Sequence, residues 1–216
     1  MIRVVCILIG YVFGLFQTSY LYGRMNGIDI RDHGSGNAGT TNALRTLGKK
    51  AGAVTFLGDC FKCVFAVWLV RALFAGRAGF PEEQMGILLG MYASLGVILG
   101  HNFPFYLGFK GGKGIAATAG LFFSLDPLLT VIAAFTFAGT VAVTRYVSLG
   151  SILVVIELMA GVLVYGVQDR WGLSQGHLLE LYGITAFLTV MALWRHRENI
   201  RRLLDGTERR IGEKAE

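Results

Sequence analysis

The sequence predicts an all-α integral membrane protein with about seven transmembrane helices, its N-terminus outside and its C-terminus cytoplasmic. Of its 216 residues, 54% are hydrophobic and only 16% are charged. Windows of roughly 20 apolar residues, the length that spans a bilayer, recur from end to end. A soluble chain of this length carries more charge and shorter apolar runs. We expect one membrane-embedded domain, 1–216, with a basic cytoplasmic segment, 195–216, at its C-terminal end.

The apolar segments have the lengths of helices and end at polar or glycine-rich residues. We place them at 2–22, 51–75, 85–106, 115–125, 128–144, 149–167 and 178–194. The first is too long for a signal-peptide core and lacks a small-x-small cleavage site, so we interpret it as retained. The fourth is a short helix, which would rise only about 16 Å, half the thickness of a hydrocarbon core. Asp126-Pro127 then predicts a break, because the residue before proline avoids the helical region.

Positive charge decides between an odd and an even number of spans. With seven spans and the N-terminus outside, most of the 20 lysines and arginines fall in cytoplasmic loops, including the block from Arg195 to Lys214. Fusing the fourth and fifth segments would leave six spans and place that block outside, against the positive-inside rule. Seven spans, or five with the same parity, also gather the glycine-rich loops on one face, as a site built from several loops requires.

Two opposite charges lie inside the second apolar segment. Asp59 and Lys62 are spaced i, i+3 and can pair on one helix face. A charge at mid-membrane costs about 2.5–3.5 kcal/mol on insertion scales and faces the protein interior. The pair is therefore a structural ion pair or a direct substrate contact. Cys60 and Cys63 in the same segment are interpreted as thiols packed in a helix. Glu157, in the sixth segment, has no evident partner.

A stretch of four glycines and two lysines, GFKGGKG at 108–114, lies between two strongly apolar segments. Glycine permits backbone conformations in which consecutive N–H groups turn inward as an anion-binding nest. The sequence therefore predicts that Gly111 and Gly112, with the ammonium group of Lys113, bind a phosphate. The alternative is a flexible loop whose lysines extend to the membrane surface.

Better-known signatures do not fit. Residues 34–39 match G-x-G-x-x-G, but an apolar helix precedes them where a dinucleotide site needs a strand. A Walker A loop would need glycine at Leu107 and Ser or Thr at Gly114. None of the four histidines begins the H-x-x-x-x-D of acyltransferases that use thioester donors. The sequence has no cluster of carboxylates that would predict a metal site, and no cofactor is implied. The net charge of +6 does not indicate nucleic-acid binding, because too little of the chain lies outside the apolar segments.

Three polar motifs remain: SGNAGTTNALRTLG at 35–48, GHNFPFYLGFKGGKG at 100–114 and RHRENIRRLLDGTERR at 195–210. In order and spacing they closely resemble the cytoplasmic motifs of the PlsY family, the bacterial acyl-phosphate:glycerol-3-phosphate acyltransferases. RYVSLGS at 145–151 resembles the family's smaller loop. The chain departs from the family pattern at Gly14-Leu15-Phe16-Gln17 in the first helix and at Ala38, where proline is common. No departure removes a phosphate ligand.

The resemblance implies transfer of a fatty acyl group from acyl-phosphate to the 1-hydroxyl of sn-glycerol 3-phosphate. The products would be lysophosphatidic acid and phosphate, in the first acylation step of bacterial phospholipid synthesis. The implied location is the bacterial cytoplasmic (inner) membrane. Membrane lipid and the acyl-phosphate-forming enzyme PlsX are the implied partners.

The resemblance also implies roles for particular residues. The implied catalytic residues are Ser35, Arg45, His196 and Asn199; the substrate-binding residues are Asn37, Gly111, Gly112, Lys113 and Ser148; and His101 and Glu208 are structural residues near the site. Because an acyl-phosphate is already activated, Ser35 is interpreted as a ligand and not as a nucleophile. The attacking hydroxyl could lose its proton to His196 or to the substrate's own phosphate.

Two other classes of protein would use basic loops on a membrane protein. An organophosphate transporter would place its site near the membrane midplane, whereas the glycine-rich motifs here share one face. A phosphotransferase acting on lipid precursors would need acidic metal ligands. Formation of lysophosphatidic acid from acyl-phosphate and glycerol 3-phosphate separates all three.

Overall fold

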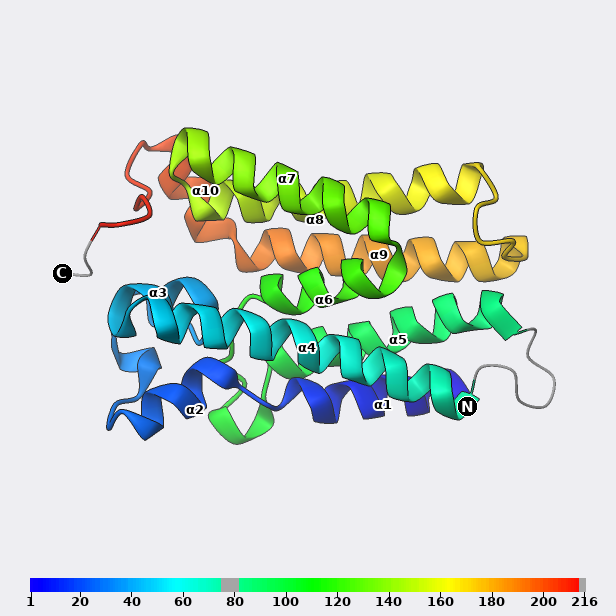
Figure 1. Cartoon of the computed structure of the whole chain (residues 1–216), viewed down its shortest axis with the longest axis horizontal. Helices are drawn as coiled ribbons and strands as arrows, with labels where there is room; N and C mark the ends of the chain where they lie inside the picture. The colour runs from blue at the N-terminus through cyan, green and yellow to red at the C-terminus, as the bar shows by residue number, and fades with distance from the viewer. Residues whose placement is uncertain (75–81, 214–216) are drawn as a thin grey trace.

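The computed structural model describes residues 1–74 and 82–213, and these residues contain helices but no strands (Figure 1). Residue 75 of the second predicted segment and residues 214–216 of the basic C-terminal segment lie outside the described part. The α-helices are α1 Ile2–Gly14, α2 Thr18–Met25, α3 Thr40–Leu47, α4 Lys49–Phe74, α5 Glu82–Asn102, α6 Ile115–Leu125, α7 Pro127–Thr144, α8 Val147–Val167, α9 Gln175–Arg195 and α10 Arg197–Leu204. Short 3₁₀ turns cover Ile30–Asp32 and Phe105–Leu107.

The described residues form six helical segments that are long and apolar enough to cross a membrane. They are Ile2–Met25, Lys49–Phe74, Met85–Leu107, Pro127–Thr144, Val147–Val167 and Gln175–Arg195. The shorter helix α6 is the seventh apolar segment, with the bounds predicted for it. In Figure 1, α6 lies between a group containing α1, α4 and α5 and a group containing α7, α8 and α9. The two termini lie at opposite ends of this bundle.

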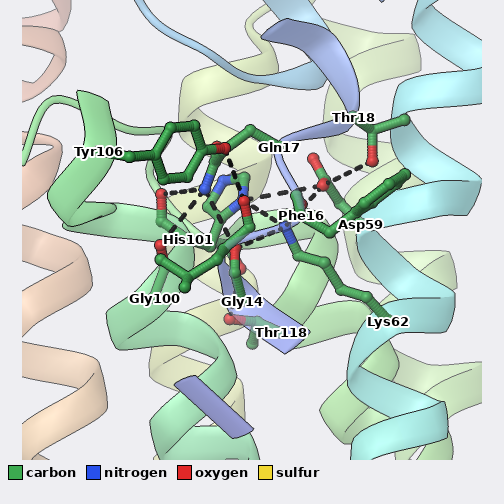
Figure 2. A network of polar contacts seen from close by, with 12 residues as sticks. Gly14, Phe16, Gln17, Thr18, Asp59, Lys62, Gly100, His101, Tyr106 and Thr118 are labelled. Carbon is green, nitrogen blue, oxygen red and sulfur yellow. Dashed lines mark hydrogen bonds and ion pairs between the residues drawn. The ribbon is translucent and has the colours of Figure 1, made fainter. Parts of the chain in front are cut away.

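The first predicted helix is interrupted, which the apolar pattern did not reveal. Between α1 and α2 the chain leaves the helical conformation, so backbone carbonyls lose their partners inside the apolar region. The side chain of Gln17 donates to the carbonyl oxygens of Gly14, Gly100 and His101 (Figure 2). Lys62 donates to the carbonyl of Phe16. A broken helix is tolerated in a membrane only where the protein supplies such partners.

Small residues bring α1 and α5 into close contact. Gly10 and Gly14 on α1 face Gly96 and Gly100 on α5, and a Cβ added at any of the four would collide with a backbone carbonyl oxygen of the other helix. Glycines four residues apart are typical of helix pairs in membranes, because they let the backbones approach. This packing fixes the end of α5, from which His101 and the loop after it reach the site.

The predicted break at Asp126-Pro127 is confirmed, and it starts α7. The carboxylate of Asp126 accepts hydrogen bonds from the backbone N–H groups of Leu128 and Leu129, at 2.8 and 3.1 Å. Pro127 occupies the first turn of the helix, where its missing N–H is not needed. The hydroxyl of Tyr165 donates to the same carboxylate from α8, at 3.0 Å. α6 is thereby ended short and joined to α7.

Candidate active site

The polar motifs meet at one end of the bundle, where α3, α10 and the C-terminal segment gather (Figure 1). They line a cavity of about 920 Å³. Its polar walls come from residues 34–45, from the loop that joins α5 to α6, and from residues 195–211. Its apolar walls come from α4, α6, α7 and α8. Ten of the eleven residues predicted for the site line this cavity: Ser35, Asn37, Arg45, His101, Gly111, Lys113, Ser148, His196, Asn199 and Glu208. Gly112 lies between two of them.

Asn42 holds the first loop in shape. Its side chain is buried, accepts from the backbone N–H of Ser35 and donates to the carbonyls of Ile30 and His33, all at 2.9 Å. Ser35 is thus held by its backbone, and its hydroxyl is free to face the cavity. Asn42 was not singled out from the sequence, although an amide on the buried face of an amphipathic helix is a usable signal.

Arg45 projects from the last turn of α3 toward the C-terminal segment. One terminal nitrogen donates to the carbonyl oxygen of Arg209 at 3.1 Å. Its Nε is buried and has no hydrogen-bond partner among the described residues. Burial lowers the pKa of Arg45, because a charge is less stable away from water. A guanidinium with unused donors in a cavity is suited to bind an oxyanion.

The glycine loop differs from the predicted nest. The N–H groups of Gly111 and Gly112 donate to the carbonyl oxygens of Asn102 and His101, at 3.2 and 3.1 Å. They are therefore not free to bind an anion. The two glycines are needed for space, because a Cβ at either would collide with His101. Their carbonyls accept from Arg195, at 3.1 and 2.7 Å.

Arg195 was not assigned a role from the sequence. Its two contacts with the glycine carbonyls join the end of α9 to the loop before α6, across 83 to 84 residues of chain. Its Nε is buried without a partner among the described residues. Nothing in the sequence indicates which of the many C-terminal arginines reaches back to this loop.

Lys113 is linked to the C-terminal segment by a chain of polar contacts. Its ammonium donates to the side-chain oxygen of Asn199. The Asn199 amide donates to Glu208 at 2.7 Å, and the hydroxyl of Ser148 donates to the same carboxylate oxygen at 2.8 Å. Arg202 binds the other oxygen at 2.7 Å. Glu208 therefore joins α8, α10 and the C-terminal segment.

The pKa values in this chain follow from burial and neighbouring charge. Burial, with the nearby positive charge of Arg202, lowers the pKa of Lys113 to about 8. Hydrogen bonds from Asn199, Arg202 and Ser148 outweigh burial at Glu208, whose pKa is lowered. At neutral pH the site therefore contains the carboxylate of Glu208 and the ammonium group of Lys113, which loses its proton more easily than an ordinary lysine does. A bound anion would stabilise that ammonium.

His196 presents a hydrogen-bond acceptor to the cavity. Its Nδ1 lies 2.8 Å from the carbonyl oxygen of Ala192, which can only accept. Nδ1 therefore carries the proton, and Nε2 has a free lone pair. Burial, followed by the charge of Lys113, lowers the pKa of His196 to about 4. The imidazole is neutral at physiological pH.

The predicted pairing of Asp59 with Lys62 is confirmed, with 2.8 Å between Lys62 Nζ and Asp59 Oδ1. Both side chains are buried, and Asp59 lines the cavity. His101 packs against the pair, with its Nδ1 2.8 Å from the ammonium (Figure 2). In the part of the chain that the structure describes, no group of three or more His, Cys, Asp or Glu is arranged to hold a metal ion.

The other end of the cavity is apolar. Its walls include Phe122 and Phe123 on α6, Ala133 and Phe137 on α7, and Val154 on α8. The helices that form these walls carry exposed apolar side chains elsewhere on their surfaces, such as Phe135 on α7 and Ile156 on α8. The cavity therefore joins a basic pocket to a surface that suits a hydrocarbon chain.

The fold and the cavity define the class: an all-helical integral membrane protein whose site suits a phosphorylated ligand carrying an apolar chain. A family model described as glycerol-3-phosphate acyltransferase matches residues 4–206. The chain belongs to the glycerol-3-phosphate acyltransferase family.

Relatives and solved structures agree with this family. A glycerol-3-phosphate acyltransferase of Clostridioides difficile (strain 630) is 42% identical over 214 residues, covering 99% of this chain and 97% of the relative. One from Alkaliphilus metalliredigens (strain QYMF) is 43% identical over 217 residues, covering 99% and 98%. The crystal structure of PlsY (YgiH), an integral membrane glycerol 3-phosphate acyltransferase, in its glycerol 3-phosphate form has a TM-score of 0.80 at 31% identity, covering 97% of this chain and 96% of that one. Its lysophosphatidic acid form gives 0.78 at 30% identity, covering 97% and 95%.

Proposed function

We propose that this protein transfers a fatty acyl group from an acyl-phosphate to the 1-hydroxyl of sn-glycerol 3-phosphate, releasing lysophosphatidic acid and phosphate. The observation that supports this most directly is the cavity itself. One continuous space of about 920 Å³ joins Arg45, Lys113 and His196 to the apolar walls at Phe122 and Phe137. An acyl-phosphate has the same division into anionic head and hydrocarbon chain.

The basic residues around the polar end match the charge of two phosphorylated substrates. A phosphate ester carries about −1.5 to −2 charges at neutral pH, so two of them repel each other unless cations lie between them. Arg45 offers a planar guanidinium and Lys113 a compact ammonium, from different elements of the chain. We assign one phosphate to each of these groups. Ser35, Asn37 and Asn199 supply neutral polar contacts.

The reaction needs no acyl-enzyme, because phosphate is already a good leaving group. The 1-hydroxyl oxygen attacks the acyl carbonyl carbon, an ester bond forms, and the carbon–oxygen bond to phosphate breaks. His196 Nε2 accepts a hydrogen bond from the hydroxyl and orients it. With a pKa of about 4, His196 is a weak base, because general bases work best with a pKa near the operating pH. The phosphate group of the attacking substrate itself, with a second pKa of about 6, is the stronger base and takes the proton from the hydroxyl.

An acyl-phosphate is short-lived in water, so a separate acyl-phosphate-forming enzyme, the predicted partner PlsX, must supply it close to the membrane. We further propose that the cavity opens on the cytoplasmic side of the bacterial inner membrane. The basic residues of the loops at that end support this orientation, because lysine and arginine are enriched on the cytoplasmic side.

The test uses purified protein in detergent, glycerol 3-phosphate and either acyl-phosphate or acyl-CoA. Equal amounts of lysophosphatidic acid and phosphate should form from acyl-phosphate, and neither should form from acyl-CoA. Lys113→Met keeps an unbranched side chain, removes the ammonium group and should remove most of the activity. Arg201→Met, at an exposed arginine whose ion pair among the described residues is with Asp205, is the matched control. Comparable rates with acyl-CoA would refute the proposed donor.

A further inference from the structure

A buried cluster beside the cavity has a geometry that the proposed reaction does not yet use. The ammonium of Lys62 donates to the carboxylate of Asp59 at 2.8 Å and to the carbonyl oxygen of Phe16 at 2.7 Å. It also lies 2.8 Å from His101 Nδ1 and donates to the carbonyl oxygen of Gly14 at 3.4 Å (Figure 2). Thr18 donates to the same carboxylate oxygen at 3.0 Å. All three charged or ionisable side chains are buried.

These contacts determine which nitrogen of His101 carries the proton. An ammonium group has donors and no acceptor, so at 2.8 Å the partner nitrogen Nδ1 has to be the acceptor. A histidine whose Nδ1 accepts carries its proton on Nε2. His101 is therefore held in the Nε2–H form by Lys62. His196 is held in the opposite form by the carbonyl of Ala192.

In the described part of the chain, the hydrogen bond of the His101 ring is made by Nδ1, to Lys62, which leaves the Nε2–H group available to a ligand. The side chain is only 2% exposed, yet it lines the cavity. Nε2 lies against the backbone of Gly112, where an added Cβ would collide with it. The next residue is Lys113, whose ammonium faces the same cavity. A donor at the wall of a cavity can form a hydrogen bond to a ligand that supplies the acceptor.

We propose that His101 is a further substrate-binding residue, whose Nε2–H donates a hydrogen bond to an anionic phosphoryl oxygen in the cavity. Lys62 is the positioning residue, because it fixes the tautomer, and Asp59 holds Lys62 in place. The identity of the ligand rests on the proposed function. The cavity then contains one histidine that donates, His101, and one that accepts, His196.

Two substitutions at His101 separate binding from packing. In His101→Gln, the amide nitrogen can occupy the position of Nε2 and still donate toward the cavity. In His101→Asn, the amide oxygen can occupy the position of Nδ1 and still accept from Lys62, but the donor is lost. We expect His101→Asn to raise the KM for one substrate by about 10- to 100-fold, the range for a hydrogen bond to a charged group. His101→Gln should stay within a few-fold of the wild type.

The source of the phosphoryl oxygen follows from which KM rises, that for glycerol 3-phosphate or that for acyl-phosphate. Thermal unfolding of each variant in detergent shows whether it is folded. If His101→Asn keeps both KM values while His101→Gln loses activity, His101 only packs against Lys62 and the proposal is wrong. A fall in kcat with both KM values unchanged would equally contradict it.

A measurement on the wild-type protein needs no variant to fold. Ring-¹⁵N-labelled histidine in the detergent-solubilised protein should give an Nε2–H signal for His101 and an Nδ1–H signal for His196. Titration with glycerol 3-phosphate or inorganic phosphate should shift the His101 Nε2–H proton saturably. A His101 protonated on Nδ1, or an Nε2–H signal that neither anion moves, overturns the proposal. This result is independent of whether acyl-phosphate proves to be the donor, so the two proposals can fail separately.

Discussion

Gly112 offers a direct test of how the glycine loop works. A Cβ at this position would collide with His101 Nε2, lie 2.8 Å from His101 Cε1, and lie 2.9 Å from the carbonyl oxygen of Ala38. Contacts under 3.0 Å force something to move. His101 is buried and held by Lys62, and the Ala38 contact is backbone, so neither yields easily. Gly112→Ala should therefore displace the loop and with it Lys113.

The size of the effect follows from the contacts at risk. A hydrogen bond to a charged group contributes about 1.5–3 kcal/mol. Displacing the loop would weaken or break the hydrogen bond that Lys113 would make to a phosphate. A loss of about 2 kcal/mol corresponds to roughly thirtyfold in kcat/KM. We expect most of it as a higher KM for glycerol 3-phosphate, with the KM for acyl-phosphate changed much less.

The assay is phosphate release at varied glycerol 3-phosphate and saturating acyl-phosphate. Gly139→Ala on α7 is the matched control, because a Cβ there meets no atom within 4 Å, and it should leave both KM values unchanged. A Gly112→Ala enzyme with wild-type kinetics for both substrates would refute the packing argument. A rise confined to the KM for acyl-phosphate would show that this loop serves the other phosphate.

Three further predictions concern topology, pH and stability. In a cysteine-free background, Lys49→Cys should be shielded from an impermeant thiol reagent in intact cells, and Gln168→Cys, at the other end of the bundle, should be labelled; the reverse pattern would invert the proposed orientation. Because the pKa of Lys113 is about 8, the ammonium is present below that pH, so kcat/KM should fall as pH rises through about 8, and Lys113→Arg should move the fall upward; an unchanged profile in that variant would contradict the assignment. Glu208→Gln weakens hydrogen bonds to a buried carboxylate, each worth about 1.5–3 kcal/mol, and should lower the unfolding temperature in detergent, whereas Asp205→Asn, at an exposed site, should not.

The helices could be predicted closely because hydrocarbon length and apolar composition determine them locally. The short α6, its end at Asp126 and the pairing of Asp59 with Lys62 follow from residues within a few positions of one another. The interruption between α1 and α2 does not follow from neighbouring residues in this way. It depends on Gln17 and Lys62 reaching carbonyls across the bundle, and these distant partners cannot be inferred from an apolar run.

The same distinction applies to the site. Its members were predictable as residue types in motifs, and the cavity gathers them. The prediction that the N–H groups of Gly111 and Gly112 are free donors was wrong. α5 ends at His101 and Asn102, and the carbonyl oxygens of these two residues accept hydrogen bonds from the two N–H groups. Whether a glycine's N–H faces a ligand or a helix end depends on the path of the chain before it. The roles of Asn42 and Arg195 depend likewise on contacts with separate segments of chain.

The cations of the cavity are arranged in a way that favours the binding of an anion. Arg45 and Lys113 line the cavity. Burial lowers the pKa of Arg45, and the pKa of Lys113 is lowered to about 8. The nearby carboxylate of Glu208 is already bound by Arg202. Buried guanidinium nitrogens of Arg45 and Arg195 lack partners in the described part of the chain. Buried donors without an acceptor are destabilising, so an anion that reached them would recover that free energy. Donors arranged before the substrate arrives need little reorganisation during the reaction, which is how such sites stabilise developing negative charge.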